Sequence, residues 1–179
     1  MLGNVHDIFS FEQCFIYSPL FSYKVLIKLL DLTSDLLANN DSRIGILVCG
    51  HGSRKNSAIR EFEELAKAIK STLPGTPLEY GYLEFARPII NEALDRLRKL
   101  SVERVIAIPS MLFAAGHTKN DIPALLKTYS QKNGLVIDYG RELGINSLMI
   151  GAAGARVQEA IDNNPPFPVS ETLLVVVGR

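Results

Sequence analysis

The sequence predicts an α/β fold in which a parallel sheet of four strands carries helices on both faces. Two observations lead to this fold class. Apolar runs of strand length alternate with segments of helical period between residues 44 and 162, and such alternation is typical of a parallel sheet. The first apolar run, residues 44–49, is uninterrupted, as in strands that are buried on both faces. Because strand–helix–strand crossovers are right-handed, the helices are expected to cover both faces.

The first half of this domain contains two predicted pairs of strand and helix. After the strand over 44–49, residues 55–72 have helical period, with an apolar side made of Phe62, Leu65, Ala66 and Ile69. The breaker cluster Pro74-Gly75-Thr76-Pro77 separates this helix from a second strand over 78–83. Pro88 is then expected as the first residue of a helix whose apolar face contains Ile89, Ala93, Leu94 and Leu97.

The second half repeats the pattern. A third strand is expected within 102–113, and the helix after it begins at Asn120-Asp-Ile-Pro123, with Leu125, Leu126 and Tyr129 facing inward. Residues 134–140 contain the fourth strand. The last helix covers 146–162, and its apolar face is expected to contain Ile150, Ala153, Val157 and Ile161.

Three segments lie outside this domain, which covers residues 44–162. Residues 1–43 are expected to be a partly helical extension, and a start codon assigned too far upstream is the alternative explanation. Residues 163–170 are a Pro-rich linker, and 171–179 form one more apolar strand. This last strand ends in Gly-Arg, much as the strand over 44–49 ends in Gly-His. We therefore expect the start of a truncated second repeat there.

Composition narrows the class of protein. Lys plus Arg number 19 and Asp plus Glu number 19, so overall charge predicts neither a nucleic-acid partner nor a membrane surface. The apolar patches within 13–33 are too short and too charged for a membrane span. Cys14 and Cys49 form no disulfide framework, which indicates a reducing, cytoplasmic location. Cys49, in a predicted buried strand, is expected to act as a small hydrophobic residue.

Two histidines follow buried strands and point to a site. His51 and His117 each come after an apolar run and a glycine, and polar residues that begin a helix follow them. The carboxyl ends of parallel strands meet at one edge of the sheet, where such folds bind ligands. Two imidazoles at this edge suggest a metal site or acid/base chemistry. From the residues alone, an ordinary loop histidine and an ordinary helix start remain open alternatives.

Four motifs resemble those of a known family: Gly50-His-Gly-Ser-Arg54, Gly81-Tyr-Leu-Glu-Phe-Ala-Arg-Pro88, Leu112-Phe-Ala-Ala-Gly-His-Thr-Lys-Asn-Asp-Ile-Pro123 and Tyr139-Gly-Arg-Glu-Leu-Gly144. They resemble the sirohydrochlorin cobaltochelatase family, the class II tetrapyrrole chelatases of the cobalamin pathway. The resemblance is strongest with the long members, which contain two repeats. It implies a flavodoxin-like α/β unit that is used twice, either within one chain or in a homodimer.

The resemblance also implies an activity, the ATP-independent insertion of Co2+ into sirohydrochlorin. The metal histidines of the family correspond to His51 and His117, and its acidic residue corresponds to Glu84. Co2+ would be the substrate metal, with no organic cofactor. Because this chain lacks most of a second repeat, a homodimer or a partner half-domain is expected to complete the cleft.

Metal insertion makes physical demands that these residue types meet. Imidazole binds borderline metals such as Co2+ and accepts protons near neutral pH, and two histidines without cysteines leave an open site. Glu84 is expected to be a third ligand or a proton acceptor. The substrate carboxylates are expected to bind to nearby cations, namely Arg54, Lys55, Arg87 and Lys119.

The rival interpretations remain open at this point. One is Fe2+ insertion for sirohaem synthesis, because ligand type does not choose between the two metals. Another is a non-catalytic metal-binding fragment. Glu84 and the cations also fit ordinary surface charges, while Asp121 and Ser53 fit helix-start residues, with Ser53 as an N-cap.

Overall fold

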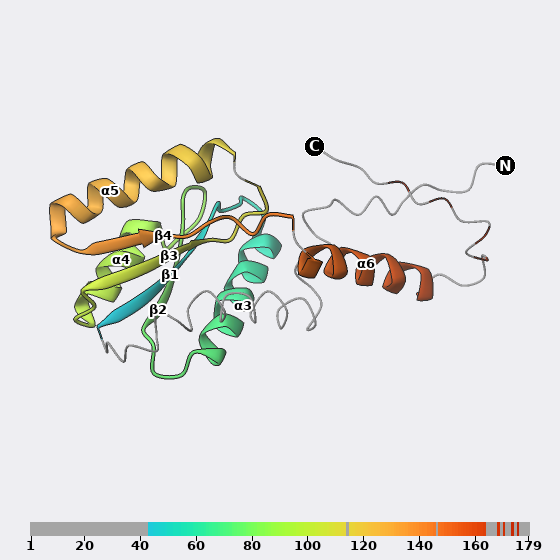
Figure 1. Ribbon diagram of the computed structural model, residues 1–179, viewed down its shortest axis with the longest axis horizontal. Helices are drawn as coiled ribbons and strands as arrows, with labels where there is room; N and C mark the ends of the chain where they lie inside the picture. The colour runs from blue at the N-terminus through green and yellow to red at the C-terminus, as the bar shows by residue number, and fades with distance from the viewer. Residues whose placement is uncertain are drawn as a thin grey trace.

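Four parallel strands form one sheet in the order β2-β1-β3-β4 in the computed structural model of the chain, which describes residues 43–113, 115–145 and 147–163, with 168, 170, 173 and 175 (Figure 1). The strands are β1 (Ile44–Gly50), β2 (Leu78–Tyr82), β3 (Arg104–Pro109) and β4 (Val136–Tyr139). The helices are α3 (Asn56–Thr72), α4 (Ile90–Lys99), α5 (Ile122–Asn133) and α6 (Ser147–Asp162), with a π-helix, η1, at His117–Asp121. The predicted fold class is confirmed.

The central strand β1 has a core on each side. All seven of its residues are buried, which explains its uninterrupted apolar sequence. Alternate residues of β1 face α3 on one side and α4 with α5 on the other (Figure 1). The first core contains Ile46, Val48, Phe62, Leu65 and Ile69. The second contains Leu47, Cys49, Leu94, Leu97, Leu126 and Tyr129.

The start of α4 differs from the prediction. Pro88 is not the first helical residue, because Ile89 after it is still extended and lies alongside β2: the Tyr82 N–H donates to the Pro88 carbonyl at 2.8 Å, and Tyr82 pairs with Ile89 in a parallel bridge. Glu92 accepts the Ile89 N–H at 3.1 Å and so fixes Ile89 as the N-cap. Ile90 therefore takes the buried position expected of Ile89.

The helix after β3 begins earlier than predicted. It starts at His117 as η1 and continues as α5, rather than beginning at Asn120. Contacts with the core stabilise the π-helical turn η1: Thr118 is buried, and its carbonyl accepts a hydrogen bond from the Tyr139 hydroxyl at 3.0 Å. Burial raises the pKa of Tyr139 to about 12, so this hydroxyl remains a donor. His117 consequently lies in the first turn of a helix.

The last helix packs less than predicted. Figure 1 shows α6 extending away from the sheet. Near its start, Met149 is buried in the core beside α3, but Ile150, expected on the apolar face, is 61% exposed. Ala153, Val157 and Ile161 are half-buried. The prediction was wrong for Ile150 because apolar spacing alone does not say which side of a helix has a neighbour.

Several predictions fall outside the described residues. They include the extension 1–42 with its helix, Cys14, most of the Pro-rich linker and most of the strand over 171–179. Within the described part, none of the helices is long and apolar enough to cross a membrane.

Cys49 is expected to be chemically silent in the folded protein. It is fully buried in β1, and burial raises its pKa to about 12. Because the folded pKa exceeds the ordinary value of about 8.5, the protonated thiol favours the fold at neutral pH, and this contribution is lost as the pH rises toward 12. In a Cys14→Ser variant, we expect no reaction with an aromatic disulfide reagent at about pH 8 until the protein is unfolded. Rapid reaction of the native protein would contradict this burial.

Candidate functional site

Three side chains from three strand ends meet at the carboxyl edge of the sheet. His51 directly follows β1, Glu84 lies two residues after β2, and His117 begins η1 after β3. His51 Nε2 lies 3.4 Å from Glu84 Oε1, and the two imidazole centroids are 4.7 Å apart. One ligand atom from each of the three residues lies within 4.8 Å of the others. The structure thus brings together the three residues that the sequence singled out for metal chemistry.

The spacing of this triad suits a metal ion bound on one side. Two ligands of a tetrahedral ion, each about 2.1 Å from the metal, lie about 3.4 Å apart. The contact between His51 and Glu84 already has this spacing, and the other separations are no wider than 4.8 Å. The side chains of His51, Glu84 and His117 are 40%, 41% and 46% exposed. The triad therefore leaves open coordination positions, and nitrogen with oxygen donors suits borderline divalent metals.

The loop after β1 is bound to the loop after β2. The Leu83 N–H donates to the Gly50 carbonyl at 2.8 Å, and the Glu84 N–H donates to the His51 carbonyl at 3.0 Å. Gly52 allows this approach, because it has a φ of +96° and a Cβ there would lie 1.7 Å from the Glu84 carbonyl oxygen. The motif glycine therefore brings His51 and Glu84 together.

Both imidazoles are oriented by a second contact. His51 Nδ1 lies 3.0 Å from the Gly52 carbonyl; because a carbonyl only accepts, Nδ1 donates and Nε2 is left toward Glu84. His117 Nδ1 lies 2.7 Å from Asp121 Oδ2. A carboxylate in this position fixes the ring and its tautomer, as in many metal sites.

Asp121 is the site residue that the sequence reasoning missed. It does lie at the start of α5, but its side chain caps no helix N–H and contacts His117 instead. The spacing of four residues within a helix was the signal that could have found this contact. Ser53 was wrongly expected as the N-cap of α3: the cap is Lys55, and Ser53 Oγ only accepts the Lys55 N–H at 3.1 Å.

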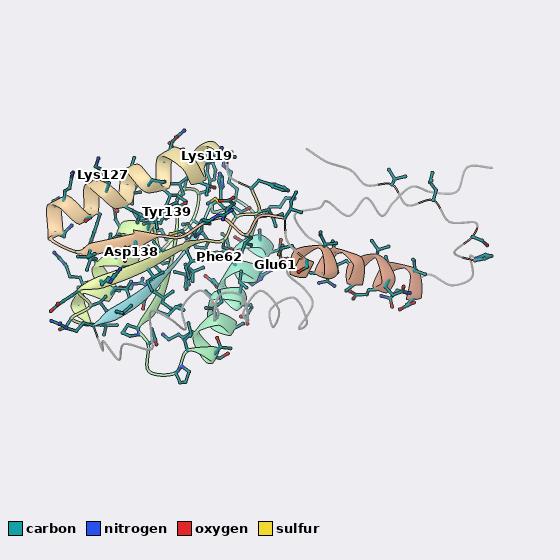
Figure 2. All side chains as sticks on the ribbon, viewed as in Figure 1. Glu61, Phe62, Lys119, Lys127, Asp138 and Tyr139 are labelled. Atoms are coloured by element: carbon teal, nitrogen blue, oxygen red, sulfur yellow. The ribbon has the colours of Figure 1, made fainter. Side chains whose placement is uncertain are left out.

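The four predicted substrate cations differ in their surroundings. The Arg54 guanidinium lies over the Phe85 ring, 4.8 Å from its centroid. Lys55 is exposed in the loop after β1, and Figure 2 shows Lys119 on η1 at the start of α5. Arg87 is paired with Glu92 of α4. Within the described residues, the side chains of Arg54, Lys55 and Lys119 form no ion pair with a carboxylate, while Arg87 already has one.

Comparison with known proteins gives a consistent picture. A family model described as CbiX matches residues 45–160. The chain is 32% identical over 136 residues to a sirohydrochlorin cobaltochelatase of Priestia megaterium, covering 75% of this chain and 44% of that protein. It is 27% identical over 135 residues to a sirohydrochlorin ferrochelatase of Bacillus subtilis, covering 75% of this chain and 50% of that protein. The chain therefore spans about half the length of these relatives.

A solved structure is also similar. The sirohydrochlorin chelatase SirB from Bacillus subtilis subspecies spizizenii, in complex with cobalt, superposes with a TM-score of 0.63 at 26% identity. The match covers 65% of this chain and 50% of that chain.

Proposed function

The chain belongs to the CbiX family, and we propose that it inserts a divalent metal ion into sirohydrochlorin without ATP. The observation that carries this proposal is the triad of His51, Glu84 and His117, whose ligand atoms lie within 4.8 Å of one another at an open sheet edge. Two imidazoles and one carboxylate can hold a metal ion loosely enough to release it. A closed site with four ligands would retain the ion.

The reaction requires two proton acceptors near the ring centre. A divalent ion enters the macrocycle as two pyrrole N–H protons leave, so the charge on the metallated ring balances. In the proposed mechanism, His51 and His117 bind the ion and then accept these protons as the ion moves onto the pyrrole nitrogens. Glu84, 3.4 Å from His51, acts as the third ligand and as a further acceptor.

The rim of the substrate carries carboxylates, which the neighbouring cations would bind. We assign this role first to Arg54, Lys55 and Lys119. Arg87 would have to exchange Glu92 for the substrate, a cost that makes it the weakest of the four candidates. Because these cations lie outside the metal triad, they can orient the macrocycle without competing for the ion.

We propose Co2+ as the substrate metal, within cobalamin biosynthesis, and no organic cofactor. Support comes from the cobaltochelatase of Priestia megaterium at 32% identity, compared with 27% for the ferrochelatase of Bacillus subtilis. Fe2+ insertion for sirohaem is the alternative, since nitrogen and oxygen donors suit both ions.

We further propose that the chain works in the cytoplasm, paired with a second copy or with a partner half-domain. The pairing is supported by the exposure of the triad, whose side chains are 40% to 46% exposed. A second unit would supply the opposite wall of the cleft over these residues.

The absorbance spectrum of sirohydrochlorin tests this function. Purified protein mixed with sirohydrochlorin and either Co2+ or Fe2+ should convert it to the metallated spectrum faster than the same mixture without protein. We expect faster conversion with Co2+. Faster conversion with Fe2+ would favour the ferrochelatase alternative, and no acceleration with either ion would favour a non-catalytic metal-binding role.

Asp121→Ala is expected to weaken Co2+ binding by about 10- to 100-fold, because the His117 ring loses the partner that fixes it. Asp121→Asn keeps an acceptor oxygen in place and should have a smaller effect. Asp138→Asn is a matched control, since Asp138 lies on β4 and pairs with Arg104 (Figure 2). Titration with Co2+ measures all three affinities. Unchanged affinity in Asp121→Ala would show that the carboxylate does not support the ligand.

A further inference from the structure

Phe85 is a large apolar side chain that remains half exposed beside the metal triad. The residue is 50% exposed, and the centroid of its ring lies 5.9 Å from that of His51, with the planes tilted by 39°. The residue directly follows Glu84 in the chain. None of the roles assigned so far explains why an aromatic ring should be placed in this position.

The backbone of Phe85 is strained. Its φ is +64°, a region that bulky L residues rarely adopt. The Ala86 N–H donates to the Glu84 carbonyl at 2.9 Å, which closes a three-residue turn of the strained kind. Glycine or asparagine would make this turn at lower cost. The turn that presents Glu84 therefore does not by itself account for phenylalanine, and strain of this kind gathers at functional sites.

Phe85 also links the triad to a cation. The Phe85 ring lies next to the His51 imidazole, and the Arg54 guanidinium lies 4.8 Å from the centroid of the same ring. Stacking on an aromatic face holds a guanidinium while its N–H groups stay free at the edge. A metal ligand, an apolar ring and a cation thus lie in contact in that order. A tetrapyrrole has the matching order, from its central nitrogens through the pyrrole carbons to the carboxylates at its rim.

We propose that Phe85 is a substrate-binding residue that packs against one pyrrole ring of the macrocycle, while Arg54, held on the Phe85 ring, binds a carboxylate of that same pyrrole. The inference rests on the proposed function, because it needs the macrocycle to be centred at the triad. It adds a contact that discriminates between tetrapyrroles by the carboxylate at one rim position.

Phe85→Asn tests the inference, because asparagine accepts a positive φ without a ring. We expect metal-free sirohydrochlorin to bind at least about tenfold more weakly to this variant. Its affinity for Co2+ alone should be unchanged, and its Tm should not fall. Ser101→Gly is the matched control: Ser101 has a φ of +61° and lies after α4, at the opposite edge of the sheet. It relieves similar strain and should leave macrocycle binding as in the wild type.

Two results would overturn the inference while leaving the metal-insertion function standing. One is unchanged sirohydrochlorin affinity in Phe85→Asn. The other is a parallel loss of Co2+ affinity, which would mean that Phe85 only holds Glu84 in place. A double-mutant cycle with Arg54→Ala adds a further test: the two losses should be less than additive, because Arg54 depends on the ring. A wild-type protein that binds Co2+ but not sirohydrochlorin would overturn both the inference and the proposed function.

Discussion

His51→Ala and His117→Ala are each expected to weaken Co2+ binding by more than about 100-fold and to abolish protein-dependent metal insertion. Each change removes one of the three proposed ligands, and we expect that the two that remain cannot hold a divalent ion at an exposed edge. The double variant should insert metal no more slowly than either single variant, because each loss alone disables the site. Titration with Co2+ and the metallation rate of sirohydrochlorin measure the two effects.

His6→Ala is the matched control for these variants, since His6 is the third histidine of the chain and belongs to none of the site motifs. It should bind and insert Co2+ like the wild type. Glu84→Gln should have a smaller effect than loss of either histidine, because the amide oxygen can still coordinate. If His51→Ala or His117→Ala retained wild-type affinity for Co2+, the triad would not be the metal site.

Gly52→Ala is expected to have the largest effect on folding. The added Cβ would lie 1.7 Å from the Glu84 carbonyl oxygen, and the φ of +96° is itself unfavourable for alanine. The contact cannot be relieved by a side-chain rotation, because the atom it meets belongs to the backbone. We expect a loss of roughly 3 kcal/mol or more in the free energy of unfolding, or a displaced Glu84 with weak Co2+ binding in any folded fraction.

Gly75→Ala separates the two contributions. Gly75 has a φ of +84°, and nothing lies within 4 Å of the position that its Cβ would take. The Gly75→Ala variant should therefore lose only about 1 kcal/mol of the free energy of unfolding, from the unfavourable φ of alanine. Its Co2+ binding should be unchanged. Thermal or denaturant unfolding measures both variants. Equal losses in Gly52→Ala and Gly75→Ala would mean that the loop at Gly52 relaxes freely and does not position Glu84.

The residues that sequence could predict are those whose position follows from topology. A strand that is buried on both faces must be continuously apolar, so β1 was evident. The carboxyl ends of parallel strands share one edge, so His51 and His117 could be expected together. The start of α4 was not predictable from Pro88, because a hydrogen bond from Tyr82 decides the local backbone. The exposure of Ile150 likewise depends on neighbours that helical period does not specify.

The supporting residues of the site were harder to predict. Asp121 is a residue type that is common at helix starts. Its carboxylate reaches His117 only because the helix begins at His117, as η1, and not at Asn120. Phe85 has a positive φ that no local preference of phenylalanine suggests. The Asp121 contact follows from where the helix begins, and the turn at Phe85 follows Glu84, whose N–H is bound to the His51 carbonyl. In both cases the residue type alone favours a different role.

The most direct measurement is the position of Co2+ bound to the protein, located by anomalous diffraction from crystals grown with the metal. We predict one Co2+ ion whose ligands are Nε2 of His51, Nε2 of His117 and a carboxylate oxygen of Glu84, each at about 2.0–2.2 Å. Water should occupy the open side, where the macrocycle would approach. A Co2+ ion bound elsewhere on the chain, with this triad empty, would contradict the account.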